Sequence, residues 1–360
     1  MSTTNPEISR SRTRALALWL FALAAAIWIM VVIGGATRLT GSGLSITEWK
    51  PILGAIPPLT EQEWEKAFDL YKQYPQYHML NPDMDLAGFK SIYIWEYLHR
   101  LWGRAIGLVF LIPLLYFWMK GCVSKKLLPK LLGIFALGAA QGAMGWFMVK
   151  SGLVDKPWVS PYRLTAHLLL ALTLFGYVLW QALNLWFEND TSKRDAIKNP
   201  PCWLFPVTLG LLLLLLAQTF FGGFMAGLHA ALSYPTFPTM NGEWVPLGIM
   251  SRSPWWVNFF ENPATVQFVH RLLGALLAFG ATAYWLATWK VQGSRAYHLG
   301  RHLLLVCALI QFQLGVWTVK NSLGHIPVAF GVLHQACGVA LLATVILLLH
   351  QARRATGHRA

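Results

Sequence analysis

The chain has 360 residues, of which 56% are hydrophobic and only 12% are charged. Soluble domains carry roughly 25% charged residues, so a composition this apolar excludes an ordinary water-soluble fold. The net charge of +14 is typical of nucleic-acid-binding proteins, but the basic residues gather in every second segment between apolar runs. That distribution indicates a membrane protein in contact with lipids and without a nucleic-acid partner.

Eight apolar runs are long enough to cross a hydrocarbon core as helices, which takes about 20 residues. They cover residues 16–36, 98–119, 127–149, 164–187, 203–225, 266–289, 302–319 and 328–350. The N-terminal segment and every second loop are rich in Lys and Arg, so the positive-inside rule predicts that both termini are cytoplasmic. No small-residue cleavage site follows the first run, and we therefore expect a retained helix in a bacterial inner membrane.

Two longer segments lie on the predicted outer side. The first, residues 38–90, contains a capping-box pattern from Thr60 to Glu63, followed by aromatic residues at helical spacing, and we expect a surface helix there. The second, residues 227–263, is rich in proline and aromatic residues. Either segment could form an aromatic belt at the membrane interface or gate a substrate site.

The chain also contains an internal repeat. The string EYLHRLWG at 96–103 matches QFVHRLLG at 267–274, and QGAMGWFMVKSGL at 141–153 matches QFQLGVWTVKNSL at 311–323. Each half holds four apolar runs, an even number, so both halves enter the membrane from the same side.

The repeat defines the expected architecture. We predict an all-α integral membrane protein whose eight transmembrane helices form two pseudo-symmetric four-helix bundles. The N-terminal bundle should comprise residues 1–190 and the C-terminal bundle residues 191–360, because a polar linker that ends in a Pro-Pro pair separates them.

Four of the eleven histidines combine membrane depth with repetition between the halves: His99, His167, His270 and His334. An unpaired imidazole inside a bilayer is costly, and a lone one most often bonds across a helix interface. Two repeated pairs on facing helices are instead typical of heme iron ligation. Zinc would need further ligands, which no cluster of cysteines or carboxylates supplies in both halves. The histidines on the predicted cytoplasmic side, including His350, are expected to be solvated.

The residues around the first histidine of each pair suggest a difference between the halves. Arg100 and Arg271 could neutralise heme propionates or reach lipid phosphates, and the sequence favours neither. Glu96 corresponds to Gln267, and each lies three residues before its histidine on one helix face. A carboxylate can assist chemistry beside a heme, whereas an amide cannot titrate, although a glutamate at a helix start could simply favour the helix dipole. The difference predicts a reacting heme in the first half and an electron-transfer heme in the second.

Five short strings together carry a family resemblance: GGATRLTGSGLS at 34–45, EYLHR at 96–100, TAHL at 165–168, FVHR at 268–271 and LHQ at 333–335. Over essentially its full length, the chain resembles the heme A synthases. Some members of that family carry a cysteine pair in the first outer segment, and this chain has none there. It is therefore similar to the subtype found in proteobacteria and mitochondria.

The resemblance implies a specific reaction and specific roles. It implies oxidation of the C8 methyl of heme O to the formyl group of heme A by successive hydroxylations, with water as the oxygen source. His99 and His167 would then face the substrate heme, Glu96 would assist its oxidation, and His270 and His334 would ligate a heme b.

The resemblance also implies partners. A heme O synthase, which is a farnesyltransferase, would supply the substrate, and cytochrome oxidase assembly would receive the product. The electron acceptor is unknown, and a homo-oligomer is compatible with the sequence. Two other hypotheses remain: a transmembrane electron-transfer cytochrome with two b hemes, and a transporter. The position of the histidines near the outer helix ends, rather than at mid-bilayer, argues against the transporter.

Overall fold

The computed structural model describes residues 6–48, 53–152, 157–188 and 197–357, with side chains from residue 11 onward. In this part of the chain, eight helices are long and apolar enough to span a membrane, which confirms the prediction of an all-α membrane protein with eight spans. They are α1 (Pro6–Leu39), α4 (Leu86–Met119), α5 (Leu128–Gly152), α6 (Pro161–Glu188), α7 (Leu204–Gly227), α9 (Pro263–Ala287), α10 (Arg295–Lys320) and α11 (Val328–Ala355).

Side-chain caps explain where several of these helices begin. The Asp85 carboxylate accepts a hydrogen bond from the Gly88 N–H and starts α4 well before the apolar run. Asn262 caps α9 ahead of a proline at the first helical position, and Ser294 caps α10 through the Tyr297 N–H. Each cap satisfies a backbone donor that would otherwise be unpaired at the helix end.

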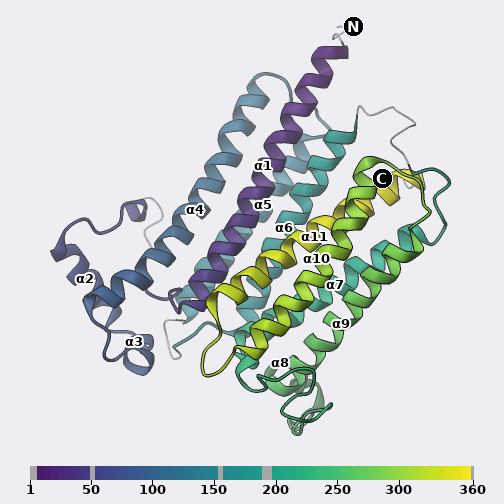
Figure 1. Cartoon of the computed structure of the whole chain (residues 1–360). Coiled ribbons are helices and arrows are strands. Elements are labelled where there is room, and N and C mark those ends of the chain that lie inside the picture. The colour runs from purple at the N-terminus through teal and green to yellow at the C-terminus, as the bar shows by residue number, and fades with distance from the viewer. Residues whose placement is uncertain (1–5, 49–52, 153–156, 189–196, 358–360) are drawn as a thin grey trace.

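Corresponding helices of the two halves make corresponding contacts. In the first half, α1 packs against α4 and α6, and α5 packs against α6; in the second, α7 packs against α9 and α11, and α10 packs against α11. The halves meet where α6 contacts α7 and α1 contacts α11. The N-terminal end of α1 and the C-terminal end of α11 lie at one end of the bundle, and the short helices α2, α3 and α8 lie at the other (Figure 1).

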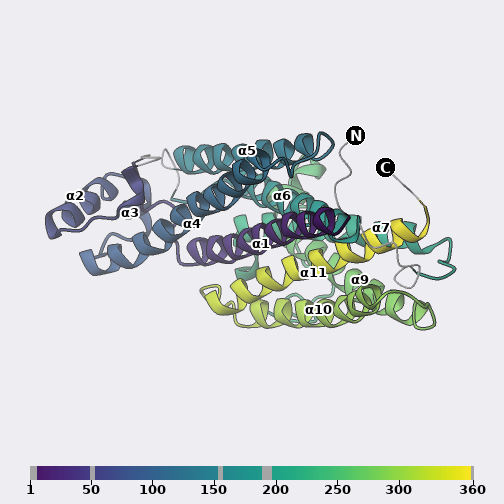
Figure 2. The ribbon, with the colours of Figure 1, turned by 90° about the horizontal axis from the view of Figure 1, so that it is seen from above.

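One pair of helices differs between the halves. Helices α4 and α5 touch at only a few residues, whereas α9 and α10 pack along one another. Figure 2 shows α4 and α5 on one side of the molecule, α9 and α10 on the other, and α1 and α11 between them. The first half is therefore the more loosely closed of the two.

A continuous apolar core joins the halves. Its fully buried members come from helices of both: Leu20 on α1, Leu131 on α5, Val178 on α6, Leu204 on α7 and Leu341 on α11. Because this core crosses the boundary between the halves, they pack as one body. The division at residues 190 and 191 remains a prediction.

The first outer segment forms the helix that the capping box predicts. Helix α2 (Glu61–Tyr71) begins at Thr60, whose hydroxyl accepts from the Glu63 N–H while the Glu63 carboxylate accepts from the Thr60 N–H. Hydrogen bonds from the Leu59 and Thr60 backbone N–H groups to the Glu63 carboxylate lower the pKa of this carboxyl. Short α3 (Pro75–Leu80) follows, and buried aromatic rings of α2 stack on Phe89 of α4.

The second outer segment is held together by asparagines rather than by long helices. Short turns at Ala230–Leu232 and Trp255–Val257 precede α8 (Asn258–Glu261). The Asn258 side chain is fully buried, accepts from the Arg252 N–H and donates to the Arg252 carbonyl oxygen. Asn262, at the start of α9, donates to the Gly248 carbonyl oxygen, so the segment is held against the start of that helix.

The expectation that His350 is solvated was wrong. Its side chain is 3% exposed, its Nε2 lies 3.2 Å from the Asn184 Oδ1, and its ring packs against Trp180 and Phe187. Helix α11 continues past the apolar run to Ala355, and its last turns pack against the end of α6. The histidine is therefore an interhelical contact.

Candidate functional site

The four repeated histidines lie on four different helices, two in each half. His99 is on α4, His167 on α6, His270 on α9 and His334 on α11, and all four rings are half-buried. The last three lie within about two turns of the start of their helices, at the end of the bundle where α2, α3 and α8 lie (Figure 1). The pairs therefore occupy the same end of the two halves.

The second pair has the spacing of two ligands to one metal atom. The ring centroids of His270 and His334 are 6.4 Å apart, and the ring planes are inclined at 72°. Imidazole nitrogens bind metal ions at about 2 Å, so two rings that share one iron atom have centroids roughly 6 Å apart. Among the described residues, no such ring contact joins His99 and His167. The rings of His270 and His334 therefore lie closer together than those of His99 and His167.

The tautomer of His334 is fixed by the neighbouring helix. Its Nδ1 lies 3.1 Å from the backbone carbonyl oxygen of Gln311 on α10, and a carbonyl can only accept, so Nδ1 carries the proton. Nε2 then keeps its lone pair, which is the form that binds iron. Metal-ligating histidines characteristically make this kind of second hydrogen bond.

A glutamine side chain accompanies three of the four histidines. The amide nitrogen lies 3.3 Å from the histidine Nε2 in each case: Gln141 at His167, Gln218 at His270 and Gln311 at His334. The amide oxygens of the three glutamines are buried and have no hydrogen-bond partner within the described part of the chain. Unpaired buried polar atoms are uncommon, and their concentration here indicates sites that a ligand completes.

A glycine on the neighbouring helix lets each imidazole approach the backbone closely. A Cβ atom built on these glycines would lie 3.0–3.3 Å from the nearest ring atom: Gly34 against His99, Gly145 against His167, Gly222 against His270 and Gly315 against His334. Any larger residue would push the ring away. The close approach of each ring edge to the neighbouring helix therefore depends on its glycine.

The Glu96 carboxylate is turned toward the first outer segment. Its Oε2 accepts from the Ser45 hydroxyl and the Ile46 N–H, both at 2.8 Å, and its Oε1 accepts from the Arg100 guanidinium at 2.6 and 3.1 Å. Its side chain is 3% exposed. Among the described residues, these are its hydrogen-bond partners, and His99 is not one of them. The helix-face argument placed Glu96 near His99, but the carboxylate itself reaches outward.

Gln267 makes the corresponding contact in the second half. Its amide nitrogen donates to the Tyr234 carbonyl oxygen at 2.9 Å, and Arg271 donates to the same oxygen at 2.8 Å. Arg100 likewise donates to the Ile46 carbonyl oxygen at 2.8 Å. Both arginines therefore hold the segment that follows the first helix of their half. The Nε of Arg271 is buried without a partner among the described residues, which leaves one donor available to an anionic group.

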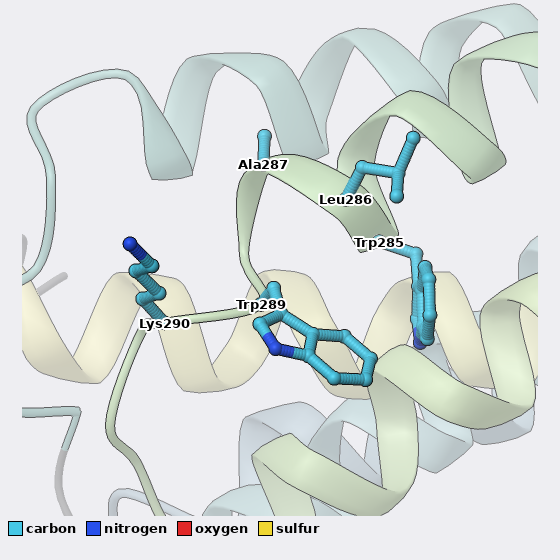
Figure 3. A pocket seen from close by; sticks show the side chains of 5 residues that line it. All are labelled: Trp285, Leu286, Ala287, Trp289 and Lys290. Atoms are coloured by element: carbon cyan, nitrogen blue, oxygen red, sulfur yellow. The ribbon is translucent and has the colours of Figure 1, made fainter.

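A separate, open hollow lies away from the four repeated histidines. It has a volume of about 500 Å³ at the C-terminal end of α9, where Figure 3 shows the side chains that line it, all within residues 285–290. Its members are Trp285, Leu286, Ala287, Trp289 and Lys290. Since His270 is near the opposite end of α9, this hollow is not part of the candidate site.

No role was predicted for the three glutamines or for Gly34 and Gly222, although Gln141 and Gln311 lie in the repeated strings. A signal for them was present, because each glutamine stands four residues before the glycine that contacts its histidine. The pattern Gln-x-x-x-Gly occurs at 141–145, 218–222 and 311–315. The pattern can be assigned to a histidine site only when the facing histidine is known.

Comparison with known proteins gives a consistent result. The family model of cytochrome oxidase assembly proteins, COX15-CtaA, matches residues 17–346. The heme A synthase of Nitrosospira multiformis is 44% identical over 342 residues, which cover 95% of this chain and 94% of that protein. The heme A synthase of Nitrosomonas eutropha is 45% identical over 332 residues and 92% of each chain. That of Parvibaculum lavamentivorans is 42% identical over 345 residues and 96% of each chain.

Proposed function

Because the chain belongs to the COX15-CtaA family of cytochrome oxidase assembly proteins, we propose that its two halves divide one activity, the conversion of heme O to heme A. That conversion makes the chain a heme A synthase, a multi-pass membrane oxidoreductase of heme biosynthesis. In this proposal, the N-terminal half binds the heme that is oxidised, and the C-terminal half holds a resident heme b.

The observation that carries the division of labour is the contrast between the two histidine pairs. His270 and His334 are in ring contact at the spacing of two iron ligands, and His334 is held in the iron-binding tautomer. The first pair lacks this close setting and lies in the half whose helices α4 and α5 are loosely packed. A permanent cofactor favours a closely set pair such as His270 and His334. A substrate that enters and leaves favours a more open pair such as His99 and His167.

The residues present fit a heme b in the second half. His270 and His334 would hold the iron, and Gly222 and Gly315 would let both rings approach α7 and α10 closely. The unpaired Nε–H of Arg271 would receive a propionate. When bound, heme b supplies one-electron transfer.

In the first half, the side chains around His99 and His167 bind and shield the substrate heme. The Glu96–Arg100 pair holds residues 45 and 46 against α4 just before His99. In this proposal, these residues close the outer side of the substrate site. A carboxylate at this position can also accept protons released as the methyl carbon is oxidised.

Orientation and partners complete the proposal. Both termini face the cytoplasm of a bacterial inner membrane, because the basic segments are gathered on their side. A heme O synthase delivers the substrate, and assembly of cytochrome oxidase takes up the product. The histidine sites then lie near the outer surface of the membrane.

Heme extraction from the purified protein tests the proposal. Hydroxylated or formyl heme, found beside heme b after incubation with heme O and an electron acceptor, is the expected result. Two unmodified b hemes per chain and no oxidised product under the same conditions would favour the electron-transfer cytochrome and refute the proposed function.

A further inference from the structure

The two halves differ at one position of the repeat that lies next to a histidine site. Gly142 on α5 corresponds to Phe312 on α10, and each directly follows a glutamine that faces a histidine. The Phe312 ring contacts the Phe237 ring of the second outer segment, with centroids 5.9 Å apart. A Cβ atom on Gly142 would meet no atom within 4 Å. The first half therefore has open space where the second half has an aromatic contact.

The face of each helix that leads to this space is buried at one end and open at the other. Leu131 on α5 is fully buried, but Gly142, about three turns further along the same face, is exposed. Leu114 on α4 is buried, but Gly107, about two turns nearer to the histidine end on the same face, is exposed. A Cβ atom on Gly107 would also meet no atom within 4 Å.

Helices α4 and α5 separate toward the end that holds the histidines. They are joined by the stacked rings of Phe110 and Phe135, whose centroids are 6.4 Å apart. Figure 2 shows the two helices spreading apart toward the side where α2 lies. Only 11% of the apolar span of α4 and 6% of that of α5 are buried, against 33% for α9 and 22% for α10. The first half is therefore open where the second half is closed by its own helices.

Unpaired polar atoms beside the same space indicate that a ligand completes it. The Gln141 Oε1 and the His167 Nδ1 are buried and have no hydrogen-bond partner within the described part of the chain. Gln141 immediately precedes Gly142, and its amide nitrogen lies 3.3 Å from the His167 Nε2. Buried polar atoms are rarely left unpaired, so the space next to Gly142 adjoins a binding site.

The chemistry of the two hemes indicates what the additional space holds. Heme O and heme b share the porphyrin, so both halves need room for that ring. Heme O also carries the long apolar chain that a farnesyltransferase adds, and heme b does not. An apolar chain gains binding free energy when it leaves water or fills a gap between apolar helices. The space that only the first half provides therefore matches the group that only the substrate has.

We propose that the farnesyl chain of heme O lies between α4 and α5 over Gly142, and that Phe312 excludes this chain from the second half. Gly142 and Phe312 are then specificity-determining residues that direct the two hemes to different halves of one repeat. The inference rests on the proposed function, in which the first half binds heme O and the second half holds heme b.

The test measures which heme the first half prefers. Purified protein that retains its heme b is titrated with heme O and, separately, with added heme b, without an electron acceptor, and binding is followed by absorbance. Gly142→Phe installs the side chain that the second half has at this position. Gly210→Phe is the matched control, since Gly210 lies on α7 in the other half and a Cβ atom there also meets no atom within 4 Å.

The wild type and Gly210→Phe should bind heme O more tightly than added heme b, because the apolar chain adds buried surface. Gly142→Phe should bind heme O roughly tenfold more weakly than the wild type, since the new ring competes with the chain for one space. Its affinity for added heme b should match that of the wild type, because the porphyrin does not occupy this space. A general defect in folding would weaken the binding of both hemes.

Phe312→Gly tests the same rule in the second half. The variant is produced in cells that make both hemes, so that the second half fills while both are present. It should contain less than one heme b per chain and more heme O and heme A together than the wild type. Extraction followed by chromatography measures all three hemes.

The outcomes separate the inference from the proposed function. An unchanged preference for heme O in Gly142→Phe, or equal losses of heme O and added heme b, would overturn the inference and leave the proposed function intact. If Gly142→Phe fails to fold, which loss of its resident heme b would reveal, Phe312→Gly decides, and a wild-type heme content there would overturn the inference. Failure of the wild-type chain to bind heme O would refute the proposed function itself.

Discussion

Glu96 and Arg100 lie one turn apart on α4, and the guanidinium Nη2 is 2.6 Å from the carboxylate Oε1. Their side chains are only 3% and 14% exposed, so the pair is almost removed from solvent. Gln267 and Arg271 hold the second outer segment in the same way without a carboxylate. A neutral amide can therefore hold an outer segment against its helix. The negative charge of Glu96 is not needed for that contact, and we infer that it has a second role.

Replacement of Glu96 by glutamine separates anchoring from charge. Glu96→Gln should fold and bind heme b, since Gln267 shows that an amide suffices at this position. Heme A formation should fall roughly 100-fold or more, the usual cost of losing a general base. The measurement is heme A per chain after incubation with heme O.

Ser45→Ala is the control for this prediction. It removes one donor from the same carboxylate and leaves the three contacts from Ile46 and Arg100 in place. Activity should fall only slightly. Equal losses in Ser45→Ala and Glu96→Gln would assign Glu96 to anchoring alone.

The second histidine pair should be required for the heme b spectrum. His270→Ala or His334→Ala should remove most of the heme b absorbance, because each deletes one of two iron ligands. His350→Ala provides a matched control, since His350 is also a buried helical histidine but bonds to Asn184 away from both pairs. An unchanged spectrum in both His270→Ala and His334→Ala would place the cofactor elsewhere.

The first pair should behave in the opposite way. His99→Ala and His167→Ala should keep the heme b spectrum and lose heme A formation, because they alter only the substrate half. Quantifying heme b and heme A in the same extract checks both parts. Loss of heme b from either variant would contradict the assignment of separate hemes to the two halves.

The spans and the repeated histidines could be predicted because both follow from local sequence. Apolar runs of sufficient length have few alternatives to a membrane helix, and an internal repeat shows which histidines share a position. The early start of α4 at Leu86 could not be read from hydropathy. Residues before the apolar run become helical because Phe89 packs against the rings of α2, which is a tertiary contact.

The direction of the Glu96 side chain also required the structure. Helical spacing correctly places residues three apart on one face, and this made Glu96 and His99 neighbours in the prediction. Long side chains on a helix point back toward its N-terminus, however, and at the start of the apolar part of α4 that direction leads to Ser45 and Ile46. The spacing rule therefore identified Glu96 correctly, but it did not predict that the carboxylate contacts Ser45, Ile46 and Arg100.

The glycine beneath each imidazole provides the last prediction. Gly315→Ala would place a Cβ atom 3.0 Å from Cε1 of His334, so the ring or α10 must shift. Forcing extra volume into such a contact costs about 1–3 kcal/mol, and heme b should bind roughly tenfold more weakly or worse. Gly138→Ala, on α5, is the control, because a Cβ atom there meets nothing within 4 Å. Titration of heme b into both variants measures the difference, and equal affinities would show that His334 does not need close contact with α10 to hold iron.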